Sequence, residues 1–156
     1  MVKFVVFGEP IPKGSKTAYP VKTRSGKYIA VTTDANPKTK GWEHLVAQAA
    51  QDHIPERLMD GAVCMRLKFY FHRPKSVSEK KRPHHTVKPD LDKLTRSVGD
   101  ALKGKIYSED SRIVFLEAHK AYGEPQRVEI EVWGKGSGSV ETGTSSGTQL
   151  LLTEDS

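Results

Sequence analysis

Residues 62–73, AVCMRLKFYFHR, contain the clearest strand pattern in the chain. Polar residues at 66, 68 and 72 alternate with a row of apolar residues: Val63, Met65, Leu67, Phe69 and Phe71. Strict alternation is the side-chain period of a half-buried β-strand. We therefore expect this strand to lie in a sheet that packs one face against the rest of the protein.

Further elements are predicted on both sides of this strand. Before it we expect a strand over Val2–Phe7 and then a loop at the Pro- and Gly-rich residues 8–14. A turn at Ser25–Gly26 and a strand over Tyr28–Thr32 follow. Next we expect a helix that is capped by Asn36, starts at Pro37 and ends at Pro55. After it we expect a basic loop over 73–89, an amphipathic helix over 91–103 that Gly104 stops, and strands over 112–121 and 126–133 that form a hairpin. Strands and helices do not alternate regularly. The predicted fold is α+β, a mixed and largely antiparallel sheet with two main helices packed on it, in a single domain.

The composition of the chain predicts where its domain ends and in which cellular compartment it lies. We expect one domain over residues 1–133 and a disordered Gly/Ser/Thr-rich tail over 134–156. Cys64 is the only cysteine, so no internal disulfide forms and a cytoplasmic, reducing compartment fits. No apolar run reaches the roughly 20 residues that cross a bilayer, so no membrane association is expected.

Basic charge is concentrated in two segments. The chain has a formal net charge of +6, and residues 73–88 alone carry six Lys or Arg against one Glu. Residues 1–40 carry eight Lys or Arg against two acids. Such a distribution favours a polyanionic partner such as nucleic acid.

Acidic residues gather directly after the second basic segment, in residues 88–113, KPDLDKLTRSVGDALKGKIYSEDSRI. Asp90 and Asp92 lie at the start of the predicted helix, where capping and the helix dipole alone would favour them. Asp110 lies in a loop just before the next strand, and the segment 104–109 is long enough to fold back along the helix. Proximity of the three carboxylates is therefore possible, and a capping role stays open.

Three converging carboxylates would repel one another unless a cation neutralises them. Mg²⁺ prefers carboxylate oxygens, and beside phosphate-binding loops it serves phosphodiester hydrolysis. A zinc site is not expected, because the chain has neither an HExxH motif nor paired CxxC motifs. A calcium loop, with its additional acids and fixed glycine, is absent as well.

The whole segment 88–113 resembles the RusA family of Holliday junction resolvases, whose pattern is roughly K-P-D-x-D-N-x-x-K-x-x-x-D-A-L followed by two adjacent acids before a strand. The stretches GEPIPKGS and FHRPKS are similar to phage-type members, and the resemblance covers about residues 1–133. It implies a homodimer that cuts four-way DNA junctions symmetrically with Mg²⁺ or Mn²⁺. It also implies that Asp90, Asp92 and Asp110 are the metal-binding catalytic acids.

Two positions depart from the family pattern. Lys93 stands where Asn is usual, and Arg96 stands where a catalytic Lys is usual. Arg96 keeps the charge and is retained as a catalytic candidate, although Arg and Lys differ in geometry. Lys93 either weakens metal binding or adds a phosphate contact.

Several cations are candidates for contacts with DNA phosphates, namely Lys13, Lys16, Lys75, Lys80, Lys81, Arg82, Lys88 and Lys93. Of these, Lys75, Lys80, Lys81 and Arg82 are expected to act together as a mobile arm. His84 and His85 are expected to be solvated, Glu109 either supports the acids or is simply exposed, and Asp100 is expected to pair with Arg96 one helical turn earlier.

The leading hypothesis is a metal-dependent endonuclease that resolves four-way junctions. A nuclease that cuts a broader range of branched DNA is one alternative. A nucleic-acid-binding module without catalysis is another, in which the acids serve as caps.

Overall fold

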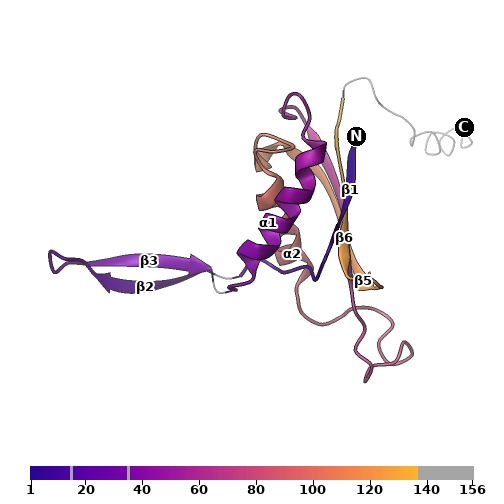
Figure 1. Cartoon of the computed structure of the whole chain (residues 1–156), viewed down its shortest axis with the longest axis horizontal. Helices are drawn as coiled ribbons and strands as arrows, with labels where there is room; N and C mark the ends of the chain where they lie inside the picture. The colour runs from indigo at the N-terminus through magenta and orange to yellow at the C-terminus, as the bar shows by residue number, and fades with distance from the viewer. Residues whose placement is uncertain (15, 35, 137–156) are drawn as a thin grey trace, which may run out of the picture.

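A four-stranded sheet carries both helices on one face, and a separate two-stranded hairpin extends from this body (Figure 1). The computed structural model describes residues 1–14, 16–34 and 36–136. Its elements are β1 (Val2–Phe7), β2 (Lys16–Lys22), β3 (Tyr28–Asp34), α1 (Thr39–Ala50), β4 (Val63–Phe71), α2 (Leu91–Leu102), β5 (Ile113–Tyr122) and β6 (Arg127–Gly134), with short 3-10 helices η1 (Gln51–His53) and η2 (Asp110–Arg112). The predicted α+β, single-domain fold is confirmed. Most of the predicted tail, from residue 137 onward, lies outside the described residues.

The strand predicted from residues 62–73 is an interior strand of the sheet. The order is β1-β6-β4-β5, with β4 parallel to β5 and antiparallel to β6, and β6 antiparallel to β1. Leu67 on β4 lies opposite Ala118 on β5 and Ile130 on β6. An interior position lets the strand with the most buried apolar face pair its backbone on both sides.

The predicted hairpin of the last two strands is wrong, because β4 lies between β5 and β6. Their connection crosses the end of β4, where Gly123 N donates to Phe71 O (2.9 Å) and His72 N donates to the Gln126 side-chain oxygen (3.1 Å). A Cβ at Gly123 would lie 2.7 Å from Cδ1 of Tyr70, so this crossing requires glycine.

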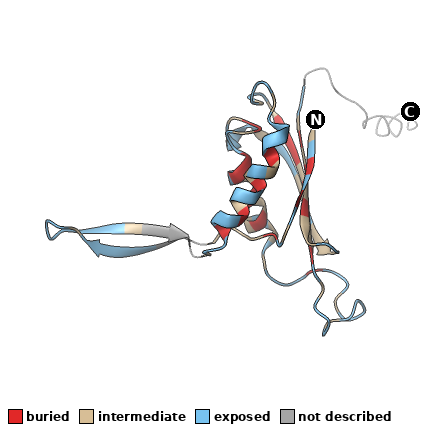
Figure 2. Ribbon diagram, viewed as in Figure 1, coloured by how far each residue is buried: buried red, intermediate tan, exposed pale blue. Residues whose placement is uncertain are grey.

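The hydrophobic core lies between the sheet and the two helices. Figure 2 shows buried residues on the helix sides that face the sheet. Helix α1 contributes Trp42, Val46 and Ala50, and helix α2 contributes Leu94, Val98, Ala101 and Leu102. The apolar stripe predicted for α2 is therefore its core face.

The region before α1 differs from the prediction in two details. The helix begins at Thr39, after a turn in which Lys38 N donates to the Asn36 side-chain oxygen (3.0 Å). Strand β2 was not predicted, because Pro20 interrupts the strand pattern by removing a backbone N–H.

No helix in the described part of the chain is long and apolar enough to cross a membrane.

Candidate active site

Two predicted acids lie exposed at the start of α2. Asp90 is the N-cap residue, with extended backbone angles (φ −73°, ψ 139°), but its side chain makes no capping hydrogen bond. Asp92 lies in the first turn and is also exposed. The Lys93 ammonium lies 3.7 Å from Oδ2 of Asp90. The carboxylate of Asp90 is therefore not used as a cap and remains accessible to a cation.

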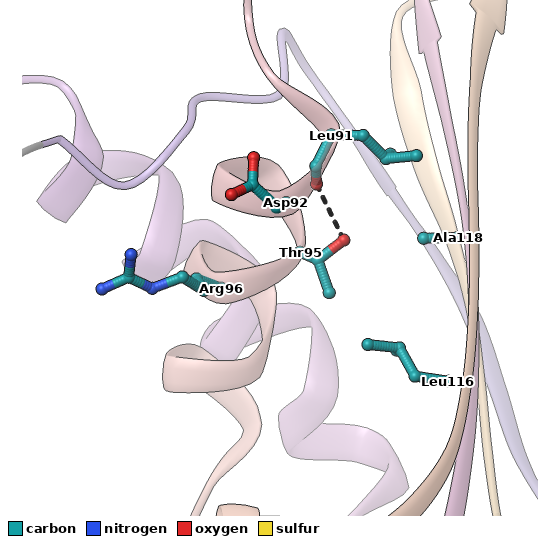
Figure 3. Close-up of a pocket in the computed structure, with 6 residues that line it drawn as sticks. All are labelled: Leu91, Asp92, Thr95, Arg96, Leu116 and Ala118. Atoms are coloured by element: carbon teal, nitrogen blue, oxygen red, sulfur yellow. Dashed lines mark hydrogen bonds between the residues drawn. The ribbon is translucent and has the colours of Figure 1, made fainter.

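Helix α2 presents different chemistry on two sides. Leu91 and Thr95 face Leu116 and Ala118 of β5 across a largely apolar groove, whereas Asp92 and Arg96 point away from the sheet (Figure 3). Thr95 donates its hydroxyl proton to Leu91 O (2.9 Å). Asp92 and Arg96 are separated by four residues and so share one helix face. An acid and a permanent cation thus stand together at an exposed edge of the groove.

The third predicted acid, Asp110, is held by a buried tyrosine. The hydroxyl of Tyr107 lies 2.9 Å from Gly99 O and 3.2 Å from Oδ1 of Asp110. Burial raises the pKa of this phenol, and the nearby negative charge of Asp110 raises it further. Gly99 is seven residues beyond Asp92, which corresponds to about 10 Å along the helix axis. Asp110 thus contacts a residue held beside the second half of α2.

The segment 104–109 folds back far enough for the Tyr107 hydroxyl to reach Gly99 O of α2. Gly104 has φ +81°, a conformation that glycine readily adopts, and its N–H donates to Tyr107 O (2.8 Å). Ile106 and Tyr107 are then fully buried. Even so, no group of three or more His, Cys, Asp or Glu residues in the described structure is placed to hold a metal ion. Asp90 and Asp92 lie together at the helix start, and Asp110 does not complete a cluster with them.

The basic loop 73–89, predicted to act as a mobile arm, is attached to the sheet by contacts of Arg73 and Arg82. The Arg73 guanidinium donates to the backbone oxygens of Ser78 (3.4 Å) and Arg82, and lies 4.2 Å from the ring centroid of Tyr122. Arg82 in turn donates to the Tyr122 hydroxyl (3.2 Å) and is only partly exposed. Arg73 and Arg82, on either side of residues 74–81, therefore both contact Tyr122 at the end of β5.

His85 also anchors the loop, contrary to the prediction that it is solvated. It is 6% exposed, and its ring centroid lies 4.4 Å from that of Phe71 and 5.0 Å from that of Tyr122. Burial lowers the pKa of His85, and the positive charge of Lys120 lowers it further. Lys120 donates to the backbone oxygens of Val87 (2.7 Å) and Pro89 (2.8 Å). The chain is thereby fixed just before Asp90, while His84 is exposed.

Lys13 connects the N-terminal loop to both helices. Its ammonium lies 2.9 Å from Oε2 of Glu43 on α1 and 3.0 Å from Oδ2 of Asp100 on α2. Its backbone N–H donates to Lys93 O (3.0 Å). Burial lowers the pKa of Lys13, but the two carboxylates outweigh that effect and the net shift is upward. The predicted Asp100–Arg96 pair is wrong, because Asp100 pairs with Lys13 instead, and Lys13 thereby ties the N-terminal loop to both helices.

Most of the other predicted phosphate-binding cations are accessible. Lys93 is partly exposed, and Lys16 is placed only as the first residue of β2. The remaining loop cations, Lys75, Lys80, Lys81 and Lys88, are exposed, and so is Arg96. The acid Glu109 is exposed as well.

Sequence reasoning missed three residues that shape this region. Tyr107 and Tyr122 were treated only as parts of their segments, and their hydroxyl contacts depend on the tertiary fold. Lys120 did carry a signal, because it falls in the alternating row of Leu116, Ala118 and Tyr122, where an apolar residue would be expected. A lysine in phase with the core positions indicates that its ammonium serves a local purpose.

Comparison with known proteins gives a consistent picture. Residues 8–133 match the protein family described as Endodeoxyribonuclease RusA. The chain is 36% identical over 140 residues to an uncharacterized protein, YqaN, of Bacillus subtilis, covering 84% of this chain and 94% of that protein. It is 43% identical over 60 residues to the crossover junction endodeoxyribonuclease rusA of Lactococcus phage r1t, covering 36% of this chain and 46% of the phage protein.

Proposed function

Because the chain belongs to the RusA family of endodeoxyribonucleases, we propose that it resolves four-way DNA junctions by paired, symmetric hydrolysis of phosphodiester bonds. The observation that carries this proposal is the exposed carboxylate of Asp90, which stands at an N-cap position without capping the helix. Asp92 and Arg96 lie exposed within the next two turns, and an anchored basic loop leads directly into the site. We assign the activity to residues 1–133 in the cytoplasm of a bacterium or phage-infected cell.

Mg²⁺ is the proposed cofactor, with Mn²⁺ as a substitute. The donor set fits, because Mg²⁺ is commonly bound by one or two carboxylates, with waters and substrate phosphates completing its shell. Asp90 and Asp92 would hold it, and Asp110 is the third proposed acid, whose described contact occupies only Oδ1. When bound, the metal would supply a more acidic water and neutralise phosphoryl charge.

The cations around these acids have separate proposed roles. Arg96 binds the phosphate at the cut, since a guanidinium matches phosphate oxygens in a bidentate manner. Lys93 partly neutralises Asp90 across 3.7 Å and so competes with the metal for that carboxylate. The exposed lysines of the loop, Lys75, Lys80, Lys81 and Lys88, bind the DNA backbone on either side of the cut.

A homodimer is proposed, because two symmetric cuts need two sites related by a two-fold axis. Strand β5 lies at the edge of the sheet and exposes Val114 (59%) and Leu116 (50%) beside the apolar groove. Exposed apolar side chains on an edge strand favour pairing with another chain. This edge is therefore the proposed contact between the two copies.

One observation favours a second candidate function. The described acids do not form a group of three, as expected for a nucleic-acid-binding module that does not cut DNA. A nuclease that cuts several kinds of branched DNA differs from the leading proposal only in its substrate range.

The test is incubation of the purified protein with a labelled four-way junction, a flap, a fork and a linear duplex of matching sequence, in Mg²⁺, Mn²⁺ or EDTA. The proposal expects paired symmetric nicks in the junction alone, lost in EDTA. Tight binding without cleavage in Mg²⁺ or Mn²⁺ would establish the binding module instead. Equal cleavage of flaps and forks would establish the broader nuclease.

A further inference from the structure

The β2–β3 hairpin projects from the body of the protein. Figure 1 shows it extending away from the sheet and both helices, and its two strands form a sheet of their own. A two-stranded hairpin is at best marginally stable in water. Of its residues 18–31, whose burial is described, all but Thr23 and Val31 are exposed (Figure 2). An element with this form is suited to contact something outside the domain.

One face of the hairpin is apolar although nothing in the described structure covers it. The antiparallel register places Tyr19 opposite Val31 and Val21 opposite Ile29, so these four side chains share a face. Tyr19 is 47% exposed and Ile29 is 51% exposed. Tyr28, on the other face near the tip, is 67% exposed. Aromatic and aliphatic groups held out in this way are available to pack against a partner.

The tip of the hairpin is strongly basic. Lys22, Arg24 and Lys27 lie within six residues, and residues 16–33 contain no acid. None of these three side chains forms an ion pair within the described part of the chain. The turn that carries them is fixed, because Thr23 N donates to Lys27 O (2.7 Å) and the Thr23 hydroxyl donates to the same oxygen (3.0 Å). The three charges are therefore presented outward on a defined turn.

The size and charge of the hairpin fit duplex DNA. A seven-residue strand is about 23 Å long at about 3.3 Å per residue. The major groove of B-DNA, about 12 Å wide, admits a two-stranded β-ribbon. Three unpaired cations without a nearby acid favour a phosphate backbone over an apolar protein surface.

We propose that the β2–β3 hairpin is a second DNA-binding element, in which Lys22, Arg24 and Lys27 contact the phosphates of a duplex arm of the substrate. This inference rests on the proposed function, since it takes DNA as the substrate. It adds a contact separate from the acids at the start of α2. Because the hairpin touches none of the described acids, it contributes to DNA affinity and leaves the chemical step unchanged.

The test compares two triple variants of equal charge. One is Lys22→Ala/Arg24→Ala/Lys27→Ala in the hairpin, and the control removes three exposed cations of the body, Lys3→Ala/Arg57→Ala/Lys103→Ala. Junction and duplex affinity are measured in Ca²⁺ without Mg²⁺ over a series of salt concentrations, after circular dichroism has established that both variants fold. Loss of three phosphate contacts should lower the slope of log K against log salt by about 2.7. We expect at least a tenfold loss of affinity in the hairpin variant and a much smaller loss in the control.

Each outcome decides the question. A hairpin variant that binds DNA no more weakly than the control overturns the inference while leaving the nuclease proposal intact. A wild-type protein that binds neither DNA overturns both. A third variant, Tyr19→Ser/Ile29→Ser, addresses the apolar face. If it changes the mass in light scattering while the tip variant binds DNA normally, the hairpin contacts a second copy of the chain and the inference is overturned.

Discussion

The hydroxyl of Tyr107 provides a sharp test of how the third acid is held. Tyr107 is fully buried, and its hydroxyl lies 2.9 Å from Gly99 O and 3.2 Å from Oδ1 of Asp110. The change Tyr107→Phe keeps the ring and removes both contacts. A neutral hydrogen bond contributes about 1 kcal/mol and one to a charged group about 1.5–3 kcal/mol. With a single proton shared between two acceptors, we expect the free energy of unfolding to fall by about 2 kcal/mol.

Urea denaturation followed by circular dichroism measures this loss. The matched control is Tyr70→Phe, because the Tyr70 hydroxyl makes no hydrogen bond in the described structure, and we expect it to change stability by less than about 0.5 kcal/mol. In melting experiments the loss in Tyr107→Phe corresponds to roughly 4–8 °C for a chain of this size.

Cleavage assays separate support of the fold from positioning of Asp110. If Tyr107 positions this carboxylate, Tyr107→Phe should raise the Mg²⁺ concentration for half-maximal junction cleavage more than it lowers the rate at saturating Mg²⁺. A purely structural role predicts no change in Mg²⁺ dependence once the protein is folded. A variant as stable as wild type with the same Mg²⁺ dependence would refute the reasoning altogether.

Four further predictions follow from other contacts. Lys93→Asn should lower the Mg²⁺ concentration for half-maximal cleavage by about 1.4- to 5-fold, since an exposed ion pair worth about 0.2–1 kcal/mol no longer competes for Asp90; an unchanged or increased requirement in metal titrations would contradict this. Lys13→Met should lower the free energy of unfolding in urea by about 1–2 kcal/mol, because two carboxylates lose their shared partner. Coupling would be confirmed if Lys13→Met costs less stability in a protein that already carries Glu43→Gln. The folded-state pKa of His85 is lowered from 6.5, so its neutral form stabilises the fold above pH 6.5 and that stability is lost as pH falls below it; His85→Phe should flatten stability against pH in this window, and an equally steep profile would argue against it. Leu94→Ala should cost about 2–5 kcal/mol in urea denaturation, since Leu94 is fully buried, and a loss below 1 kcal/mol would show that it does not belong to the core.

The sequence predicted those elements whose signal is periodic and local. The alternation around Leu67 identified the interior strand, and the stripe from Leu91 to Leu102 identified the core face of α2. Strand neighbours were less predictable. The residues Gly123–Pro125 show where the chain turns, but only the packing of Gly123 against Tyr70 shows that the turn passes over another strand.

In the candidate site, too, local features could be predicted from the sequence, whereas contacts made by the tertiary fold could not. Asp90 and Asp92 could be placed at a helix start, because capping preferences are local. The contacts of Lys13 with Glu43 and of His85 with Tyr122 join elements that are not adjacent in the sequence, and no periodicity reports them. The position of Asp110 likewise depends on burial of Tyr107, which the segment 104–109 alone did not reveal.

Cleavage of a labelled four-way junction by Asp92→Asn, beside Asp52→Asn as an exposed acid outside the site, tests the central claim most directly. We predict that Asp92→Asn loses paired cleavage in Mg²⁺ by about 100-fold or more, as expected for loss of several kcal/mol of transition-state stabilisation, and still binds the junction in Ca²⁺. Asp52→Asn should cut as wild type does. Undiminished cleavage by Asp92→Asn would contradict the account, since the acids at the start of α2 would then serve only the helix.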